Sequence, residues 1–363
     1  MRLEHLTFTR FIAALTVVFF HYGNSVTPFN IPPFDKIFQA GPIAVSYFYA
    51  LSGFIMAIAY YRPKTPENFN KWKYWLARFA RIYPVYLIAL LLIFIANYRT
   101  MENASSSLFL NLSMLQAWIP GYPLTLNSPG WSLSVEAFFY LIFPLLLLFI
   151  YRGGLKIVIV LSIVLWVATQ ILHTYLLNSP AYAIHNGLHD FIYYNPLMHV
   201  NTFVMGLLVG IYFQNKALYK KAPSYNYNAT ALFTVLTIIA LLLIIRPSLK
   251  LWLGFDVDYT NGLIAPLFLL SILLLAQQQG SIAKIFSASW LVLLGEASYS
   301  LYILQRPVYG IYHKYIATHF VVSELWHFYF YLTFLIILSI VSYKLFETPL
   351  RHWINTWYRS KPR

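Results

Sequence analysis

Long apolar stretches recur from one end of the sequence to the other, and they constrain the fold more than any other feature. A helix of about 20 apolar residues is long enough to cross the hydrocarbon core of a bilayer. Ten stretches of about this length occur, at 7–23, 42–60, 79–97, 132–151, 155–177, 197–213, 229–246, 261–277, 291–313 and 326–346. The sequence therefore predicts an all-α, polytopic integral membrane protein of about ten transmembrane helices, forming one domain over residues 1–363.

The basic residues predict which way these helices run. Ten spans place both termini on the same side of the membrane, and 19 of the 25 Lys and Arg residues fall at connections on that side. Since Lys and Arg are retained on the cytoplasmic side, we expect the N-terminus and the C-terminus to be cytoplasmic. The same rule accounts for the net charge of +14. Nucleic-acid binding is the other common reason for such a charge, but the sequence has no soluble basic segment that could serve it.

Composition and missing motifs exclude several kinds of chemistry. The chain has no cysteine, which excludes disulfides, thiolate metal sites and a cysteine-borne thioester intermediate. The sequence also lacks a Walker loop, a GxSxG elbow and an HExxH pair, the usual signatures of nucleotide hydrolysis, serine hydrolases and zinc proteases.

The first apolar stretch holds two ionisable residues, Arg10 and His21, in the sequence RFIAALTVVFFH. Eleven residues at about 100° each return to nearly the same helix face, roughly 16 Å further along the axis. Ionisable groups are costly inside a bilayer and commonly mark a functional pathway. Because this span runs outward, Arg10 is expected near the cytoplasmic surface and His21 in the outer part of the membrane.

Glu136 is the predicted partner of His21. The fourth stretch runs inward from WSLSVEAFFYLIFP, which places Glu136 about one turn below the outer surface. A carboxylate at the depth of His21 could fix the imidazole tautomer and raise its basicity for general-base chemistry. The alternative is that His21 bonds to a neighbouring carbonyl and that Glu136 caps a helix or snorkels to the surface.

Arg78 and Arg81 form a second group, at the inner surface. Their i, i+3 spacing in RFARIYP puts them on one helix face, at a level similar to that of Arg10. Three guanidinium groups suit a polyphosphate ligand, whereas ordinary positive-inside anchoring is the alternative. Glu296 and Glu347 fall at the same level and are possible partners of these arginines.

Three smaller groups have both a structural and a functional interpretation. Ser52 and Gly53 could serve close helix packing or could leave room for the tail of a ligand. Trp118, Tyr122 and Trp131 could form an interfacial aromatic belt or stack on sugar rings. The third group is His185, His189 and Asp190, whose flanking NSPAYAIHNG reads as a loop, so we expect no metal there.

Several stretches together resemble the membrane acyltransferase family 3, whose members O-acylate bacterial surface glycans. Besides Arg10 and His21 at the R-x10-H spacing, the matching pieces are YFYALSGF at 47–54, RFARIYP at 78–84, NSPGWSLSVEAFFYLIFP at 127–144, SYSLYILQRP at 298–307 and FETPLR at 346–351. They cover nearly the whole chain in family order. One departure is Gln305, which stands where many relatives carry histidine.

The resemblance implies ten helices, a cytoplasmic acyl-CoA as co-substrate donor, and a glycan hydroxyl on the far side as acceptor. It implies that His21, Arg10 and Glu136 are catalytic and that Arg78 and Arg81 contact the donor. The expected donor site also includes Ser52 and Gly53, and the expected acceptor site comprises Trp131, Trp118 and Asn127. No tightly bound cofactor and no metal are expected, and the location implied is the bacterial inner (plasma) membrane.

Other functions use the same polar residues. An exporter or flippase of a lipid-linked glycan or small metabolite would need the polar path but no thioester donor. A membrane-bound O-acyltransferase of the eukaryote-rich type shares an intramembrane histidine, but its pattern is not seen in the sequence. The acceptor glycan, the acyl length and the oligomeric state are left open by the sequence.

Overall fold

The chain folds into a bundle of helices in a computed structural model that describes residues 3–62, 69–219, 227–319 and 321–359, and that part contains no β-strand. Each predicted apolar stretch overlaps a helix. These helices are, in order, α1 (Glu4–Tyr22), α3 (Ile43–Tyr60), α4 (Lys71–Asn97), α6 (Gly130–Gly153), α7 (Leu155–Leu177), α9 (Val200–Tyr219), α10 (Tyr227–Ile245), α12 (Ala265–Ala276), α14 (Ser289–Tyr315) and α15 (Glu324–Ser342).

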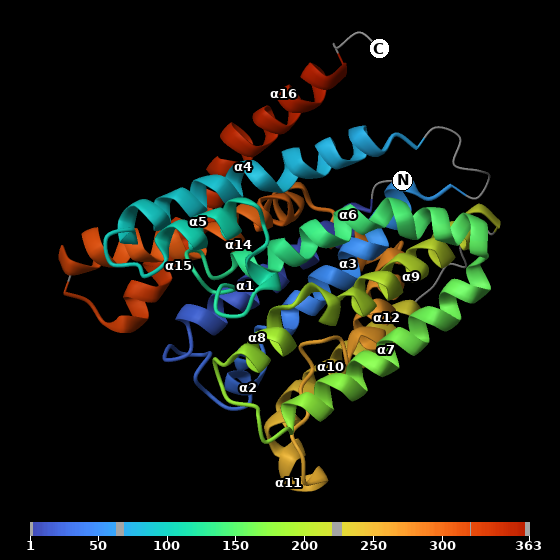
Figure 1. The fold of residues 1–363 in the computed structure, drawn as a ribbon, viewed down its shortest axis with the longest axis horizontal. Coiled ribbons are helices and arrows are strands. Elements are labelled where there is room, and N and C mark those ends of the chain that lie inside the picture. Colours follow the sequence, from blue (N-terminus) through green and yellow to red (C-terminus); the bar gives the residue numbers. More distant parts are fainter. Residues whose placement is uncertain (1–2, 63–68, 220–226, 320, 360–363) are drawn as a thin grey trace.

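Shorter helices occupy several of the connections and follow α15. They are α2 (Phe34–Gln39), α5 (Ala104–Leu112), α8 (Gly187–Tyr194), α11 (Leu249–Leu253), α13 (Ser281–Phe286) and α16 (Thr348–Arg359). The N-terminal end of α1 lies at the upper right in Figure 1, whereas α2, α8 and α11 lie toward the bottom.

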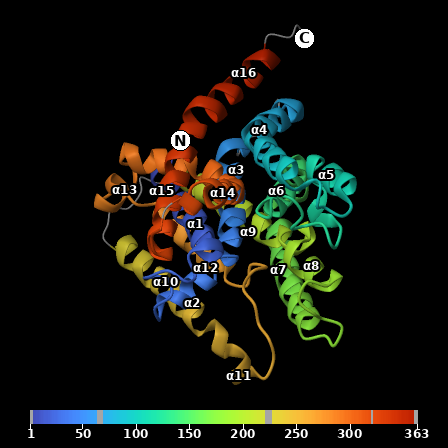
Figure 2. The ribbon, with the colours of Figure 1, turned by 90° about the vertical axis from the view of Figure 1, so that its left-hand side faces the viewer.

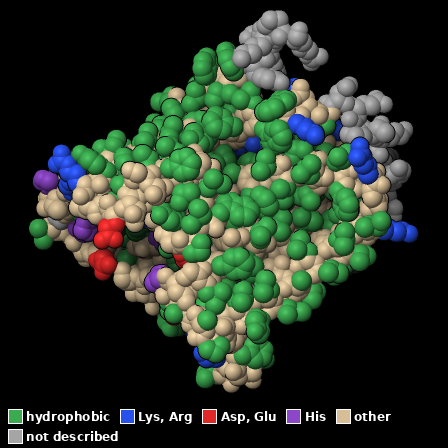
Figure 3. All heavy atoms as spheres, viewed as in Figure 1, with side chains coloured by type: hydrophobic (Ala, Val, Ile, Leu, Met, Phe, Trp, Pro, Cys, Tyr) green, Lys and Arg blue, Asp and Glu red, His purple; other side chains and the backbone are tan. Residues whose placement is uncertain are grey.

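Six helices of the described chain are long and apolar enough to cross a membrane. They are Ile43–Tyr60, Lys71–Asn97, Gly130–Gly153, Leu155–Leu177, Ala229–Leu253 and Glu324–Trp357, with Ala265–Ala276 as a shorter apolar helix. The chain is therefore a multi-pass membrane protein by helix length and composition. The outer helix α7 exposes a row of apolar side chains, including Ile157, Val160 and Val164. Hydrophobic side chains cover much of the face drawn in Figure 3, as expected for contact with lipid tails.

Two helix pairs form the centre of the bundle, α3 with α9 and α1 with α14. Figure 2 shows these four helices in the middle, with α4, α6 and α7 on one side and α10 and α13 on the other. Glycines allow the backbones to touch within each pair. A Cβ on Gly206 of α9 would lie 2.2 Å from the carbonyl oxygen of Ala50, and one on Gly295 of α14 would lie 2.1 Å from that of Thr7. Small residues of this kind are the common means of close helix packing in membranes.

Helix α14 is continuous through Arg306-Pro307, the place where the sequence suggests an interruption of the ninth span. Proline removes one backbone donor from a helix, and such losses are tolerated in membrane helices when neighbouring groups compensate. Helix α14 packs along α1, and its residues Glu296, Ser298, Tyr299 and Tyr302 line the same cavity as Arg10.

Candidate active site

A cavity of about 430 Å³ lies between α1, α3, α4, α6 and α14. Four arginines and two glutamates line it, namely Arg10, Arg62, Arg78, Arg81, Glu136 and Glu296. The lining carries two more positive than negative charges if all six residues are ionised. Its remaining wall is mostly apolar, with Leu51, Ile55 and Met56 of α3 among the lining residues. A concave, largely apolar site with a few convergent charges is typical of a binding site for a small molecule or cofactor.

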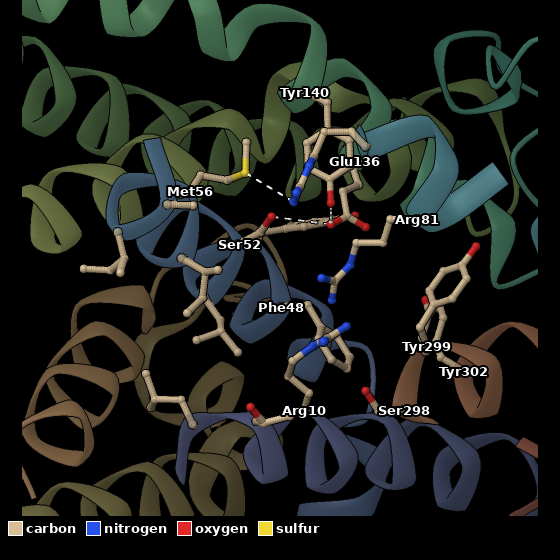
Figure 4. Close-up of a pocket in the computed structure, with 18 of the residues that line it drawn as sticks. Arg10, Phe48, Ser52, Met56, Arg81, Glu136, Tyr140, Ser298, Tyr299 and Tyr302 are labelled. Atoms are coloured by element: carbon tan, nitrogen blue, oxygen red, sulfur yellow. Dashed lines mark hydrogen bonds between the residues drawn. The ribbon is translucent and has the colours of Figure 1, made fainter. Parts of the chain in front are cut away.

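The structure brings the three predicted arginines together. Arg10 rises from α1 and Arg81 descends from α4, so that their side chains approach each other across the cavity (Figure 4). The two guanidinium groups repel one another, while Glu136, Glu296 and Glu347 attract both of them. Like charges held in a medium of low dielectric constant are stabilised by a bound anion. This geometry supports the ligand interpretation of the arginines over simple anchoring.

Arg78 is fixed more firmly than the other two arginines. Its Nη2 donates a hydrogen bond to the Tyr60 hydroxyl at 3.2 Å, and its guanidinium lies over the rings of Tyr60 and Tyr140 at 5.5 and 5.8 Å. Its Nε is buried and has no partner in the described chain. Arg78 is therefore held in place by aromatic rings and still has one donor available to a ligand.

Glu136 lies in this cavity with the arginines. Its Oε1 accepts hydrogen bonds from the Tyr140 hydroxyl, one turn further along α6, and from Ser52 Oγ at 3.4 Å. The prediction that Ser52 belongs to the ligand site agrees with its place in the cavity lining. Glu136 is thus a carboxylate fixed by two hydroxyl groups within a positively charged cavity.

The predicted pairing of His21 with Glu136 is not formed. The partners of Glu136 are Ser52 and Tyr140, whereas His21 lies three turns beyond Arg10 on α1, outside the lining of the cavity. The segment before α6 packs into the bundle, where Asn127 and Leu126 are 0% and 3% exposed. Glu136, nine positions after Asn127, faces the arginine cavity and not His21.

His21 has different neighbours. Its side chain is exposed, its ring contacts are with Phe20 and Tyr22, and the nearby charge that acts on it is Arg306 of α14. Tyr22 stacks on Tyr309 at 4.2 Å, which joins this end of α1 to α14. His21 therefore stands at an accessible position beside a guanidinium group, away from the carboxylate.

Gly53 packs against α9 and does not line the cavity. A Cβ there would lie 2.1 Å from the carbonyl oxygen of Phe203, so the absence of a side chain is needed for helix contact. This geometry favours the packing interpretation of Gly53, and no space for a ligand tail is found at that residue.

The three residues expected to bind the acceptor are not brought together at the cavity. Asn127 is fully buried, and its Nδ2 donates to the carbonyl oxygen of Ile303 at 2.9 Å. Trp131 packs on Tyr194 with ring centroids 5.0 Å apart, and Trp118 meets Phe138 edge to face. Their observed contacts join segments of the outer region to the bundle, and their expected role in acceptor binding stays a prediction.

The histidines of the connection at 178–196 contact neighbouring residues of the same connection. The Tyr182 hydroxyl and His189 Nδ1 are hydrogen-bonded at 3.0 Å, and Asp190 accepts a bond from the backbone N–H of Gly121 at 2.7 Å. Burial lowers the pKa of His189. Within the described residues no group of three or more His, Cys, Asp or Glu side chains could hold a metal ion.

Gln305, the departure from the family pattern, faces away from the cavity. It is fully buried, and its Nε2 donates to the carbonyl oxygen of Tyr302, while the backbone carbonyl oxygen of Gln305 accepts from the Tyr331 hydroxyl at 3.0 Å. Here the side chain caps a backbone group of α14 beside α15. Histidine at this position would meet the same surroundings.

Tyr140, Arg62 and Tyr302 are among the cavity residues that sequence reasoning missed. Tyr140 is detectable only through its i, i+4 spacing from Glu136, and Arg62 only as the first charge after α3. Tyr302 gives no signal of its own in the aromatic-rich segment SYSLYILQRP. Each becomes recognisable once α3, α6 and α14 are known to surround one space.

Comparisons with known proteins show which family the chain belongs to. A family model described as an acyltransferase domain matches residues 4–344. The chain belongs to this acyltransferase family. Because the match includes α1 through α15, all the helices that supply the cavity lie within the family domain.

Individual relatives agree with this assignment. The chain is 34% identical to Acyltransferase MdmB of Streptomyces mycarofaciens over 40% of its own length and 39% of the relative. It is 24% identical to Putative O-acetyltransferase SACOL0978 of Staphylococcus aureus (strain COL) over 94% of its own length and 56% of the relative. The chain thus spans about half the length, or less, of these curated relatives. No solved structure matches the chain.

Proposed function

We propose that the chain is an O-acyltransferase of the bacterial inner membrane that moves an acyl group from cytoplasmic acyl-CoA to a hydroxyl of a surface or exported glycan. The proposal includes ten membrane spans with both termini in the cytoplasm, as the distribution of basic residues predicts. Acetyl is the favoured group, because the relatives that align over most of the chain carry the name O-acetyltransferase.

The observation that carries this proposal is the arginine-lined cavity. Coenzyme A is an anion with several phosphate groups, and arginine is the residue best suited to bind phosphate oxygens. Arg10, Arg78 and Arg81 converge on one space with a net positive lining, and an apolar wall continues from them along α3. Phosphates would lie on the guanidinium groups, and the pantetheine arm would lie along Ile55 and Leu51.

The chemical step needs a base on the acceptor side, and His21 is the available group. In the proposed reaction, the acceptor oxygen forms a bond to the thioester carbonyl carbon while its proton passes to the imidazole. The C–S bond breaks, and the departing CoA thiolate takes up the proton that the imidazolium gives back, which restores neutral His21. In the alternative order, His21 carries the acyl group first and then passes it to the glycan.

Glu136 acts on the donor side in this proposal. With its partners Ser52 and Tyr140 it forms a fixed polar group beside the arginines. At this position its charge can orient the donor. It does not orient His21 directly, since the two residues lie in different places. Glu136 is therefore a positioning residue for the donor.

Two measurements test the proposal. Purified protein in detergent should bind acetyl-CoA and transfer or slowly hydrolyse its acetyl group, and surface glycans should lose an acetyl mass when the gene is deleted. A protein that binds no acetyl-CoA, in a cell whose glycans keep their acetyl groups but are no longer exported, would support the exporter alternative. That outcome would refute the acyltransferase proposal.

A further inference from the structure

The cavity ends before it reaches His21. Along α3 its lining extends from Arg62 through Ser52 to Phe48 and Val45, but on α1 the lining stops at Arg10. The α1 residues that follow, among them Ala13, Ala14 and Val17, are buried. The space between Arg10 and His21, roughly 16 Å along the helix axis, is therefore closed by packed side chains.

Tyr302 of α14 lies at this closed end. Its ring meets Phe48 of α3 edge to face with centroids 5.8 Å apart, and its hydroxyl is hydrogen-bonded to Ser132 Oγ of α6 at 2.8 Å. Ser132 Oγ donates to the carbonyl oxygen of Pro129 at 2.9 Å. Because a serine hydroxyl has a single hydrogen, Tyr302 must donate to Ser132. Tyr302 thus joins three helices across the end of the cavity.

His21 lies beyond this barrier, next to Tyr22, whose ring stacks on Tyr309 of α14. Arg306, which acts electrostatically on His21, follows Tyr302 by four residues on the same face of α14, or about 6 Å along the axis. Tyr302 is only 7% exposed, whereas His21 is exposed. The same helix therefore presents one side chain to the arginine cavity and another, one turn later, to the accessible region of His21.

We propose that Tyr302, held by Phe48 and Ser132, is the barrier that keeps the acyl thioester in the arginine cavity apart from water and from His21 until transfer. This inference rests on the proposed function. One neutral hydrogen bond and one ring contact fix the orientation of the side chain, and opening requires a change of its rotamer together with a shift of the α1 side chains packed beyond it. Active sites commonly exclude water by such closure, which prevents hydrolysis of reactive groups.

The decisive experiment measures acetyl-CoA hydrolysis without acceptor, as free CoA thiol released by the purified, detergent-solubilised full chain. In this reaction water attacks the thioester carbonyl carbon, the C–S bond breaks, and acetate and the CoA thiol are formed. Tyr302→Ala is expected to raise the hydrolysis rate several-fold above wild type while acetyl-CoA still binds. Tyr302→Phe, which keeps the ring contact but loses the bond to Ser132, is expected to give a smaller rise.

Tyr312→Ala is the matched control. Tyr312 is on the same helix, is 5% exposed and has a hydroxyl hydrogen-bonded to His327 Nδ1 at 3.2 Å, but it does not line the cavity. Its loss should lower stability without raising hydrolysis. General loosening of α14 would instead raise hydrolysis equally in both variants, and this would overturn the inference.

Further outcomes separate this inference from the proposed function. If wild type binds acetyl-CoA and the Tyr302 variants bind it equally well but hydrolyse it no faster, Tyr302 is not a barrier. If wild type binds no acetyl-CoA, the proposed function itself fails. Should Tyr302→Ala not fold, Tyr302→Leu keeps an apolar side chain at the site while removing the flat ring and hydroxyl, and the same rise in hydrolysis is required of it.

Discussion

Arg10 of α1 and Arg81 of α4 face each other across one cavity although they are 71 positions apart in the sequence (Figure 4). The structure records no hydrogen bond from either guanidinium to another described residue. Two half-buried like charges without such bonds repel each other, and an anionic ligand between them relieves that repulsion. This relationship motivates the first prediction.

Replacing Arg81 with glutamine should weaken CoA binding by about ten- to a hundred-fold, since a hydrogen bond to a charged group contributes about 1.5–3 kcal/mol. Titration calorimetry of the purified protein with CoA measures this change. Arg99→Gln is the control, because Arg99 is exposed and its Nε bonds to the neighbouring Tyr98 hydroxyl. Equal affinities in wild type and Arg81→Gln would show that this arginine does not contact the ligand.

Glu136→Gln should separate binding from turnover. The amide is similar in size and can still accept hydrogen bonds from Tyr140 and Ser52, but it removes one negative charge from the cavity. Binding of the anionic donor should therefore stay the same or tighten, while acetyl transfer should fall. Weaker CoA binding in this variant would contradict a role confined to orienting the donor.

His21→Ala should abolish glycan acetylation and leave CoA affinity unchanged, because His21 lies outside the cavity lining. Mass spectrometry of surface glycans gives the first readout and calorimetry the second. His319→Ala is a suitable control, since His319 is also exposed and bonds only locally, to Thr318. Normal acetylation in cells that carry only His21→Ala would rule out its catalytic assignment.

Gly206→Ala should destabilise the protein by about 1–3 kcal/mol, the usual cost of inserting a group into a packed interior. The added Cβ would meet the backbone of Ala50 at 2.2 Å, and a backbone atom cannot rotate away. Gly310→Ala provides the comparison, because a Cβ there meets nothing within 4 Å. Thermal unfolding in detergent should show a lower midpoint for the first variant and no loss for the second.

Much of the fold is predictable from hydrophobicity alone. Every predicted apolar stretch coincides with a helix, because a run of about 20 apolar residues has few alternatives in a bilayer. The grouping of Arg10 with Arg78 and Arg81 is predictable from the same spans, since alternating direction assigns each residue a depth.

The position of Glu136 could not be obtained in this way. The groups it contacts depend on how the segment before α6 folds back into the bundle, where Asn127 bonds to Ile303 in a distant part of the sequence. No periodic pattern encodes such a contact. The same limit applies to Tyr302, whose importance comes from meeting Phe48 and Ser132 rather than from any local motif.

The glycine contacts also determine how the site can change shape. Gly206 locks α9 to α3, and Gly295 locks α14 to α1, while the cavity lies between these two pairs. Backbones in such close contact cannot slide or separate without large steric cost, so each pair should move as a rigid body. Entry and release of a ligand would then require a shear of one pair past the other, with α4 and α6 following the motion at the periphery.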